Sequence, residues 1–250
     1  MLAACSGDPD DELVSDQEDE LSADAFKVIT HNIWGGHNEG ATASLDYVTD
    51  QARSFGPDVV MMQEVCEGQV ATFKARFPKW DVRYSPMIPV DERCGNKAIG
   101  IVLASKWNMS DVQVTDLGVD FGKQFTLLCA DLAKPGVPAH GVRACATHLR
   151  AWDDADAEPM RIKQTATIHA TLEKRIKQRH QAVIVAGDFN TGPHREPLDN
   201  MYVQKLNGKL DGKGLFREAD QNDKKFFGSE PQKAPDRKCA PNSCRSGQDT

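Results

Sequence analysis

Short hydrophobic runs recur along the chain, and each is typical of a β-strand in a protein core. The run from 182 to 187 is apolar and largely β-branched, the composition of a strand buried on both faces. It is followed at once by Asp188 and Asn190. Similar runs, bounded by glycine, proline or polar residues, predict strands at 26–34, 58–65, 80–84, 98–104, 112–117, 125–132 and 142–149.

Helical spacing of hydrophobic residues predicts helices between several of these strands. Apolar residues recur at this spacing over 45–55, and Gly56 with Pro57 ends the segment. Further helices are predicted over 70–77 and, with the clearest apolar stripe, over 158–180. Strands interleaved with helices and hairpins indicate an α/β fold with mixed sheets and helical covers. From Gly192 onward the chain is polar and has no further apolar strand pattern.

Composition divides the chain into an acidic leader and one large domain. The 250 residues are 40% hydrophobic and 27% charged, enough for a sizeable core. The net charge of −7 arises in residues 1–25, whose nine acidic residues leave 30 basic and 28 acidic residues elsewhere. We therefore expect a disordered linker over 1–25 and a near-neutral domain over 26–250. Such a domain permits a phosphate-bearing substrate but has no basic stripe typical of nucleic-acid binding.

The first residues suggest where the protein acts. Leu2-Ala3-Ala4-Cys5 resembles a bacterial lipobox, in which the cysteine is lipidated. The cationic segment and most of the apolar segment of a signal peptide are absent, so a chance match is the alternative. The acidic linker suits a tether, and we expect an exported lipoprotein on the bacterial cell surface, or a secreted protein. No run of 18 apolar residues is present.

Polar side chains follow four of the predicted strands. They are Asn32, Glu64, His148, and Asp188 with Asn190. Taken singly, each is explained by a surface position or a turn. Together, two carboxylates, two amides and a histidine match the oxygen-rich sites that hold Mg²⁺ beside a phosphate. Such a metal polarises a phosphoryl group, and a nearby carboxylate can take a proton from water. Zinc is less favoured, because no cysteine or histidine pair has ligand spacing.

The segments that carry these residues are ITHNIWGG, VVMMQEV, ATHL and VAGDFN, in this order. They resemble the endonuclease/exonuclease/phosphatase superfamily, as does an R-x-x-Q pattern formed by Arg161 and Gln164. The resemblance covers residues 26 to about 200. It implies a four-layer α/β sandwich of the deoxyribonuclease type. It also implies cleavage of a phosphoester with Mg²⁺, or with Mn²⁺ or Ca²⁺ as alternatives.

The resemblance also implies a role for each residue. Glu64 would hold the metal, and Asn32 would support the metal or the phosphate. Asp188 would orient or deprotonate the attacking water, and Asn190 would hold the scissile phosphate. His148 would donate a hydrogen bond to the phosphate or act as an acid.

Two further features follow from the same resemblance. Arg93 and Asn96 lie where family members place phosphate-contacting residues. The family pattern ends with a strand bearing an aspartate and a later Asp-His pair, and nothing matching these precedes Thr250. We therefore expect the chain to lack the last strands of the fold, which could leave this form inactive.

The cysteines apart from Cys5 number six, an even count that indicates disulfides in an exported protein. Two of them lie on consecutive predicted strands and could face each other, and two others could close a small loop near the C-terminus. The pairs expected are Cys129 with Cys145, Cys239 with Cys244, and Cys66 with Cys94. The alternative is six reduced, buried thiols.

The leading hypothesis is an exported, monomeric, metal-dependent phosphodiesterase, most commonly a nuclease. The alternatives within the family are a sphingomyelinase or phospholipid phosphodiesterase, and a phosphatase of small phosphoesters. The partner would be a nucleic acid or a phospholipid head group, with a possible membrane tether at Cys5. A lipid enzyme would need an exposed aromatic hairpin, for which Phe226-Phe227 is the one candidate. A non-catalytic surface binding protein is the rival from another class.

Overall fold

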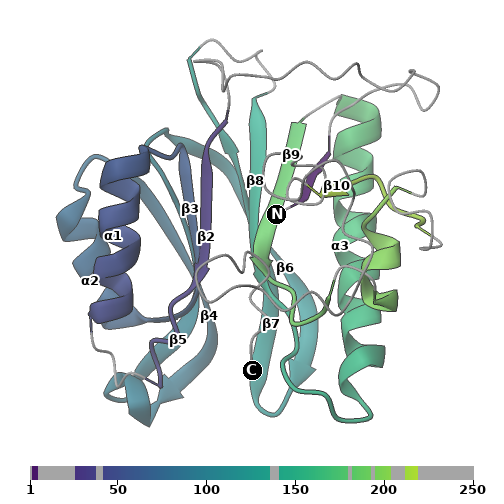
Figure 1. The fold of residues 1–250 in the computed structure, drawn as a ribbon, viewed down its shortest axis with the longest axis horizontal. Coiled ribbons are helices and arrows are strands. Elements are labelled where there is room, and N and C mark those ends of the chain that lie inside the picture. The colour runs from purple at the N-terminus through teal and green to yellow at the C-terminus, as the bar shows by residue number, and fades with distance from the viewer. Residues whose placement is uncertain are drawn as a thin grey trace, which may run out of the picture.

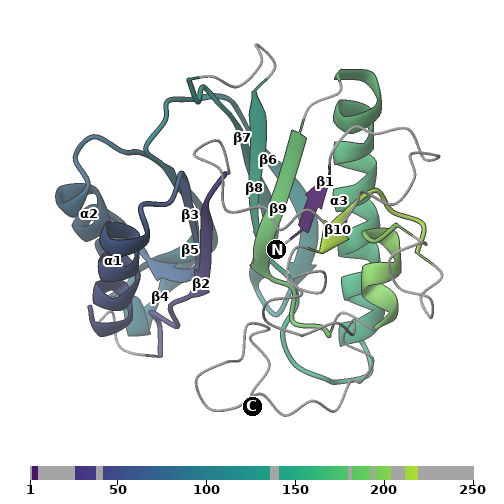
Figure 2. The same cartoon turned by 45° about the horizontal axis from the view of Figure 1, so that its top comes forward.

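Two β-sheets pack face to face, with helices on both outer sides (Figure 1). The computed structural model describes residues 2–4, 26–37, 42–135, 141–179, 182–192, 195–203 and 212–218. In this part of the chain the layers follow one another as helices, sheet, sheet and helix (Figure 2). The predicted four-layer α/β sandwich is confirmed.

The first sheet has four strands in the order β2-β3-β5-β4. Their bounds are β2 Val28–Asn32, β3 Val59–Cys66, β4 Asp81–Asp91 and β5 Lys97–Ser105. Strands β2 and β3 run parallel, and the other pairs are antiparallel. The parallel pair brings the carboxyl ends of β2 and β3 to the same edge.

The second sheet has six strands in the order β10-β1-β9-β8-β7-β6. Their bounds are β1 Leu2–Ala4, β6 Met109–Asp120, β7 Lys123–Leu132, β8 Val142–His148, β9 Ala182–Asp188 and β10 Arg217–Glu218. Here β8 and β9 form the parallel pair, with His148 opposite Asp188. Each sheet therefore contributes one pair of parallel strand ends.

The helices cover the outer faces of the sheets (Figures 1 and 2). Helices α1 (Ala43–Phe55) and α2 (Glu67–Arg76) pack on the four-stranded sheet, and α3 (Ala157–Arg179) packs on the six-stranded sheet. Two 3-10 turns, η1 (Glu92–Cys94) and η2 (Glu196–Asn200), complete the described elements. None of the described helices is long and apolar enough to cross a membrane.

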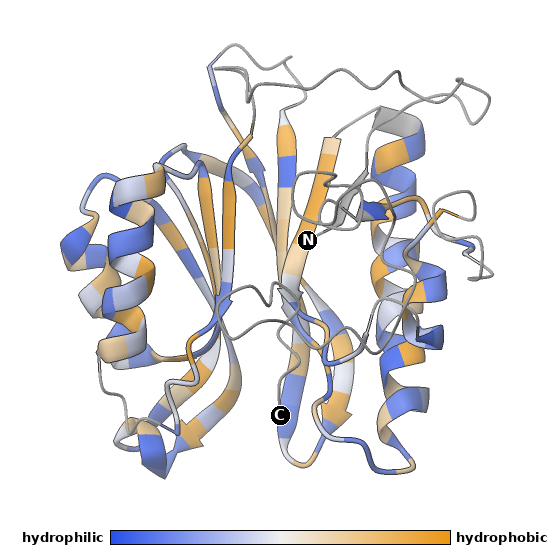
Figure 3. Cartoon of the chain, viewed as in Figure 1, coloured by the Kyte–Doolittle hydropathy of each residue, from blue (hydrophilic) through white to orange (hydrophobic). Residues whose placement is uncertain are grey.

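Strand β3 shows why the apolar runs form central strands. Val59 and Met61 pack into the core between the two sheets, whereas Val60 and Met62 pack into the core beneath α1 and α2. All four side chains are fully buried, because alternate residues of a strand point to opposite faces. Figure 3 shows the result: the central strands are largely hydrophobic, and the outer helices are mixed.

The structure differs from the sequence prediction at three strands. Strand β4 extends to Asp91, because an edge strand tolerates Pro86 and Pro89, which hid its length in the sequence. Leu2–Ala4 was expected within a linker but pairs with β9 as β1, through main-chain hydrogen bonds that need no hydrophobic pattern. Strand β10 was also not predicted.

Several predictions concern residues outside the described part of the chain. Residues 5–25, with the lipidation candidate Cys5, are among them. So are Cys239, Cys244 and the aromatic pair Phe226-Phe227. The linker, the lipid tether and the absence of the last strands stay predictions.

Candidate active site

The polar residues predicted at strand ends come together from both sheets. Asn32 ends β2 and Glu64 lies near the end of β3, while His148 and Asp188 end the neighbouring strands β8 and β9. Strand β2 of one sheet lies beside β9 of the other (Figure 1). Residues up to 156 positions apart in sequence therefore meet at one edge of the sandwich.

Asn32 joins the two sheets at this edge. Its side-chain Nδ2 donates to Glu64 Oε1 at 3.1 Å and to Asp188 Oδ2 at 3.0 Å. Its Oδ1 accepts a hydrogen bond from the backbone N–H of Trp34 at 3.0 Å. Both ends of the amide are engaged, so its orientation is fixed and the two carboxylates are held close together.

His148 faces the same two carboxylates. Its Nε2 lies 3.8 Å from Glu64 Oε1 and 3.9 Å from Asp188 Oδ2. The side chain is only 6% exposed, and its buried Nδ1 has no hydrogen-bond partner among the described residues. The imidazole is therefore held by packing and strand position, with Nε2 directed at the carboxylates.

A β-bulge sets the direction of Glu64. The pairing of β3 with β5 shifts register between Met62 and Val65, and Glu64 adopts a left-handed backbone with φ of 56°. This conformation is uncommon for a glutamate, and bulges of this kind re-aim side chains near functional sites. The Glu64 carbonyl is held by the N–H of Gly35 at 2.9 Å. A Cβ at position 35 would lie 2.6 Å from that carbonyl oxygen, which explains the glycine.

The ends of β8 and β9 are locked to each other by hydrogen bonds. Asp188 Oδ1 accepts from the N–H of Asn190 at 2.9 Å, and Asn190 Nδ2 donates to the Leu149 carbonyl at 3.0 Å. Leu149 N–H in turn donates to the Asp188 carbonyl at 2.9 Å. Asn190 thus fixes the Asp188 carboxylate, and its own side-chain nitrogen is engaged. Its predicted contact with phosphate stays a prediction.

Arg93 lies beside the site but is already paired. Its Nε and Nη2 contact the Asp91 carboxylate at 3.0 and 2.7 Å, and this contact lowers the pKa of Asp91. Its Nη1 lies 3.4 Å from His37 Nε2. The Asp91 contact raises the pKa of Arg93, and the Glu64 charge adds to this effect. Asn96 is exposed and closes the turn after η1 with φ of 59°.

Two of the three expected disulfides are confirmed. Cys129 and Cys145 lie directly opposite on β7 and β8, and their sulfurs are bonded. The second disulfide joins Cys66 to Cys94 and so ties the end of β3 to η1. Because Cys66 follows Glu64 by two residues and Cys94 follows Arg93, this bond links the Arg93 segment to the glutamate.

Removal of the Cys66–Cys94 bond should therefore affect stability and substrate binding together. For the Cys66→Ser, Cys94→Ser variant we expect a loss of about 3–4 kcal/mol of unfolding free energy, measured by denaturant titration. We also expect a higher KM, because the Arg93 segment loses its link to Glu64. The control is Cys129→Ser with Cys145→Ser, which should cost about 3 kcal/mol without raising KM. Equal KM changes in both variants would contradict this role.

The R-x-x-Q pattern has a structural role in the loop after β8. Arg161 is 2% exposed, and its Nη1 donates to the carbonyls of Arg150 at 3.1 Å and Trp152 at 2.8 Å. Gln164 Oε1 accepts from the N–H of Arg150 at 3.0 Å. Helix α3 therefore holds the loop that continues from His148.

Sequence analysis missed Lys123, the first residue of β7. Burial lowers the pKa of Lys123, and its ammonium lies 4.6 Å from the centroid of the Trp152 ring, in the loop after His148. No motif marks this lysine. Only the turn pattern Asp120-Phe121-Gly122 precedes it, and a turn pattern does not say what the turn lies against.

The residues at this edge suit a hard divalent cation. Among the described residues, no group of three or more His, Cys, Asp or Glu side chains forms a ready metal cluster. Mg²⁺, however, is commonly held by one or two carboxylates, with water and phosphate oxygens completing its shell. Glu64 Oε1 and Asp188 Oδ2 both contact the same Asn32 nitrogen, so they converge enough to offer such a pair.

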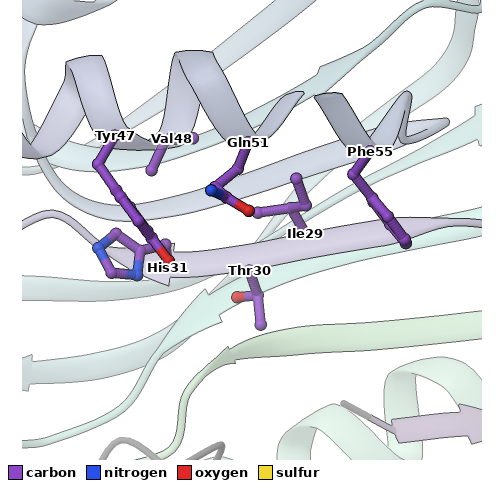
Figure 4. Close-up of a pocket in the computed structure, with 7 residues that line it drawn as sticks. All are labelled: Ile29, Thr30, His31, Tyr47, Val48, Gln51 and Phe55. Carbon is purple, nitrogen blue, oxygen red and sulfur yellow. The ribbon is translucent and has the colours of Figure 1, made fainter. Parts of the chain in front are cut away.

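A separate pocket of about 250 Å³ lies between β2 and α1 (Figure 4). It is lined by Ile29, Thr30, His31, Tyr47, Val48, Gln51 and Phe55. Burial lowers the pKa of His31, which disfavours its charged form there. None of the predicted catalytic or metal residues lines this pocket, so the candidate site is the open edge where the strands end.

Known structures share this fold. The truncated TDP2 of Caenorhabditis elegans is 20% identical, with a TM-score of 0.54, over 67% of this chain and 63% of that one. TDP2 of Danio rerio, complexed with a single-strand DNA product, is 19% identical, with a TM-score of 0.52, over 70% and 64%. A mannosyl-6-phosphatase of Bacteroides thetaiotaomicron is 12% identical, with a TM-score of 0.54, over 70% and 69%.

This chain thus spans less than two thirds of the Caenorhabditis elegans protein it matches. No curated protein matches the chain. The model of the Endonuclease/Exonuclease/phosphatase family matches residues 29–237, most of the chain and all of the site described above. The chain belongs to the endonuclease/exonuclease/phosphatase family.

Proposed function

We propose that this protein is a divalent-metal-dependent phosphodiesterase that cleaves nucleic acid. The observation that carries the proposal is the convergence of Glu64, Asp188 and His148 around the Asn32 amide. Two carboxylates, each within 4 Å of the same imidazole nitrogen at an open edge, together with that imidazole can both activate water and contact phosphate. A binding surface alone would not require this combination.

Each residue has a task that its geometry supports. Glu64, with Asp188 beside it, would hold the cation, which when bound would polarise the phosphoryl group and stabilise the departing oxyanion. Asp188 takes the proton of the attacking water as the water oxygen bonds to phosphorus and the ester bond breaks. His148 Nε2 donates a hydrogen bond to a phosphate oxygen, and Asn32 keeps the two carboxylates in place.

The choice of nucleic acid rests on the structural relatives. The Danio rerio TDP2 structure contains a single-strand DNA product. The Bacteroides mannosyl-6-phosphatase favours a second candidate, the hydrolysis of small phosphate esters.

Export is part of the proposal too, since structural disulfides such as Cys66–Cys94 and Cys129–Cys145 persist in oxidising compartments. A lipid at Cys5 would then tether the enzyme to the membrane.

Parallel assays on three substrates test this function. We expect hydrolysis of a single-stranded oligonucleotide in Mg²⁺, its loss in EDTA, and its recovery when Mg²⁺ is added back. Sphingomyelin and a sugar 6-phosphate serve as the competing substrates. Faster hydrolysis of the sugar phosphate would favour the small-molecule phosphatase. Faster hydrolysis of sphingomyelin would favour the phospholipid phosphodiesterase.

Glu64→Gln should abolish both Mg²⁺-dependent activity and Mg²⁺ binding measured by calorimetry. The matched control is Glu173→Gln, the same change at an exposed carboxylate paired with Lys177 on α3. Mg²⁺ binding without activity on any of the three substrates would overturn the catalytic proposal in favour of a binding role. Activity that resists EDTA would overturn its dependence on a metal.

A further inference from the structure

Two exposed aromatic side chains meet beside the candidate active site. Phe121 lies in the turn between β6 and β7 and is 69% exposed, and Trp152 lies in the loop after β8 and is 56% exposed. Their ring centroids are 5.6 Å apart, with an interplanar angle of 87°. Two separate elements thus present an edge-to-face aromatic pair to solvent, where each ring gains little from burial.

The backbone at both positions is held in an unfavourable conformation. Phe121 has φ of 47° and Trp152 has φ of 69°, in the left-handed region that bulky residues rarely adopt. Such conformations cost free energy and persist where the surroundings enforce them, often at functional sites. At Phe121 the two-residue turn between the paired Asp120 and Lys123 requires this conformation, and Gly122 shares it with φ of 71°, so the hairpin itself fixes the direction of the Phe121 ring.

A buried arginine holds the two loops together. Arg150 is 1% exposed and pairs with Asp120, beside Phe121, and with Asp154 at 2.8 Å. Its guanidinium carbon lies 5.0 Å from the centroid of the Phe121 ring and 5.7 Å from that of Trp152. The Trp152 carbonyl is in turn bound by Arg161 from α3. The aromatic pair is therefore preorganised.

A lysine lies next to the aromatic pair. Lys123 Nζ lies 4.6 Å from the centroid of the Trp152 ring. Lys123 begins β7, and Leu127 of this strand lies opposite Thr147 of the antiparallel β8, so the lysine lies toward the end of β8 that carries His148. Trp152 also follows His148 by only four residues. A positive charge therefore lies beside the rings, toward the strand end that carries His148.

We propose that Phe121 and Trp152 form a stacking platform for an unpaired nucleobase next to the scissile phosphate, with Lys123 facing the phosphate backbone. This inference rests on the proposed function and specifies its substrate as single-stranded or frayed nucleic acid. Aromatic side chains combined with a cation are how proteins bind single strands without reading their sequence. A base stacks by its flat face, so the domain needs no extended basic stripe.

A lipid surface fits these rings less well. Asp153 follows Trp152 directly, its side chain is 90% exposed, and Asp154 beside it is 45% exposed. Insertion of Trp152 into a bilayer would carry these carboxylates toward the hydrocarbon, at a large desolvation cost. Stacking on a base leaves them in water.

Two chromogenic esters that differ only in the nucleoside separate stacking from catalysis. They are the 4-nitrophenyl ester of thymidine 5′-phosphate and methyl 4-nitrophenyl phosphate. For Trp152→Asn we expect the ratio of kcat/KM for the first ester over the second to fall about 5- to 150-fold, which corresponds to one lost stacking contact. Phe121→Asn should lower the ratio in the same direction.

Asparagine is chosen because it accepts the left-handed backbone, so these variants should remain folded. Trp152→Phe keeps an aromatic ring and should keep most of the ratio. Phe55→Ala removes an exposed aromatic ring, 43%, from the last residue of α1, where it contacts Lys27 at the opposite end of β2 from Asn32, and should leave the ratio unchanged. An unchanged ratio in both asparagine variants would overturn the stacking platform and leave the proposed function intact.

If the unchanged protein hydrolyses neither these esters nor the single-stranded oligonucleotide, the proposed function fails and binding decides the platform alone. A labelled single-stranded oligonucleotide is then compared with one of the same length made of abasic sites, by fluorescence anisotropy. Tighter binding of the base-bearing strand that is lost in Trp152→Asn supports stacking. Equal binding of both strands overturns it. Tryptophan emission is also measured with phosphatidylcholine vesicles and with the oligonucleotide. A shift that occurs only with vesicles and is lost in Trp152→Asn overturns the stacking platform in favour of a lipid-binding surface.

Discussion

Asp188→Asn should lower kcat for phosphodiester hydrolysis by about 10²- to 10⁴-fold, the range typical of a lost general base. The amide cannot take a proton from water at neutral pH, and it is a weaker ligand for a divalent cation. The fold should persist, because an asparagine oxygen can still accept from the Asn190 N–H, as Asp188 Oδ1 does at 2.9 Å, although the new amide nitrogen cannot accept from Asn32 Nδ2 as Asp188 Oδ2 does. The substitution also relieves the repulsion between two carboxylates that share the Asn32 amide.

Steady-state kinetics and thermal denaturation of the same preparations check this prediction. Asp50→Asn is the matched control, since it makes the same change at a carboxylate whose side chain is 73% exposed on α1. It should leave kcat and the melting temperature unchanged. An active, folded Asp188→Asn protein would show that the proton is taken by another group.

Gly187→Ala should destabilise the protein by about 3 kcal/mol or more and also reduce activity, although position 187 contacts no substrate. A Cβ at this position would lie 2.0 Å from the Thr147 carbonyl oxygen and 2.8 Å from its carbon. Both are backbone atoms of the neighbouring strand, so β8 and β9 would have to move apart. Because Asp188 and His148 follow these residues directly, a displacement of about 1 Å could cost about 10²-fold in rate.

Gly68→Ala provides the control for Gly187→Ala. Gly68 lies in α2, and a Cβ there would meet nothing within 4 Å. The alanine should therefore stabilise the helix by about 0.5–1 kcal/mol, without affecting activity. Denaturant titration measures both variants. A Gly187→Ala protein as stable as the unchanged protein would mean that the two strands adjust freely at this point.

Elements with a regular hydrophobic pattern were predictable from the sequence. The strands β3, β5 and β9 are buried on both faces, so their composition alone marks them. The length of β4 was not predictable, because Pro86 and Pro89 contradict a strand pattern and only an edge position makes them acceptable. The three residues of β1 carry no pattern at all and pair through their backbone.

The residues of the site and their chemical types could be predicted from the sequence, whereas their arrangement in space could not. Each of Asn32, Glu64, His148 and Asp188 ends or nearly ends a strand, so the sequence placed them at strand ends by itself. It could not show that a bulge turns Glu64 toward Asp188, or that Asn32 bonds to both. Hydrogen bonds between residues 156 positions apart depend on how the two sheets pack.

By itself, then, the sequence determined where the central strands lie along the chain, the polar residues that end four of them and the cysteines opposite one another on β7 and β8. These follow from local composition and from the two-residue period of strands. Only the tertiary structure decided that Lys123, Phe121 and Trp152 adjoin the site. They lie on a turn and a loop whose positions are set by Arg150 and Arg161, and buried ion pairs between distant segments leave no periodic trace in a sequence.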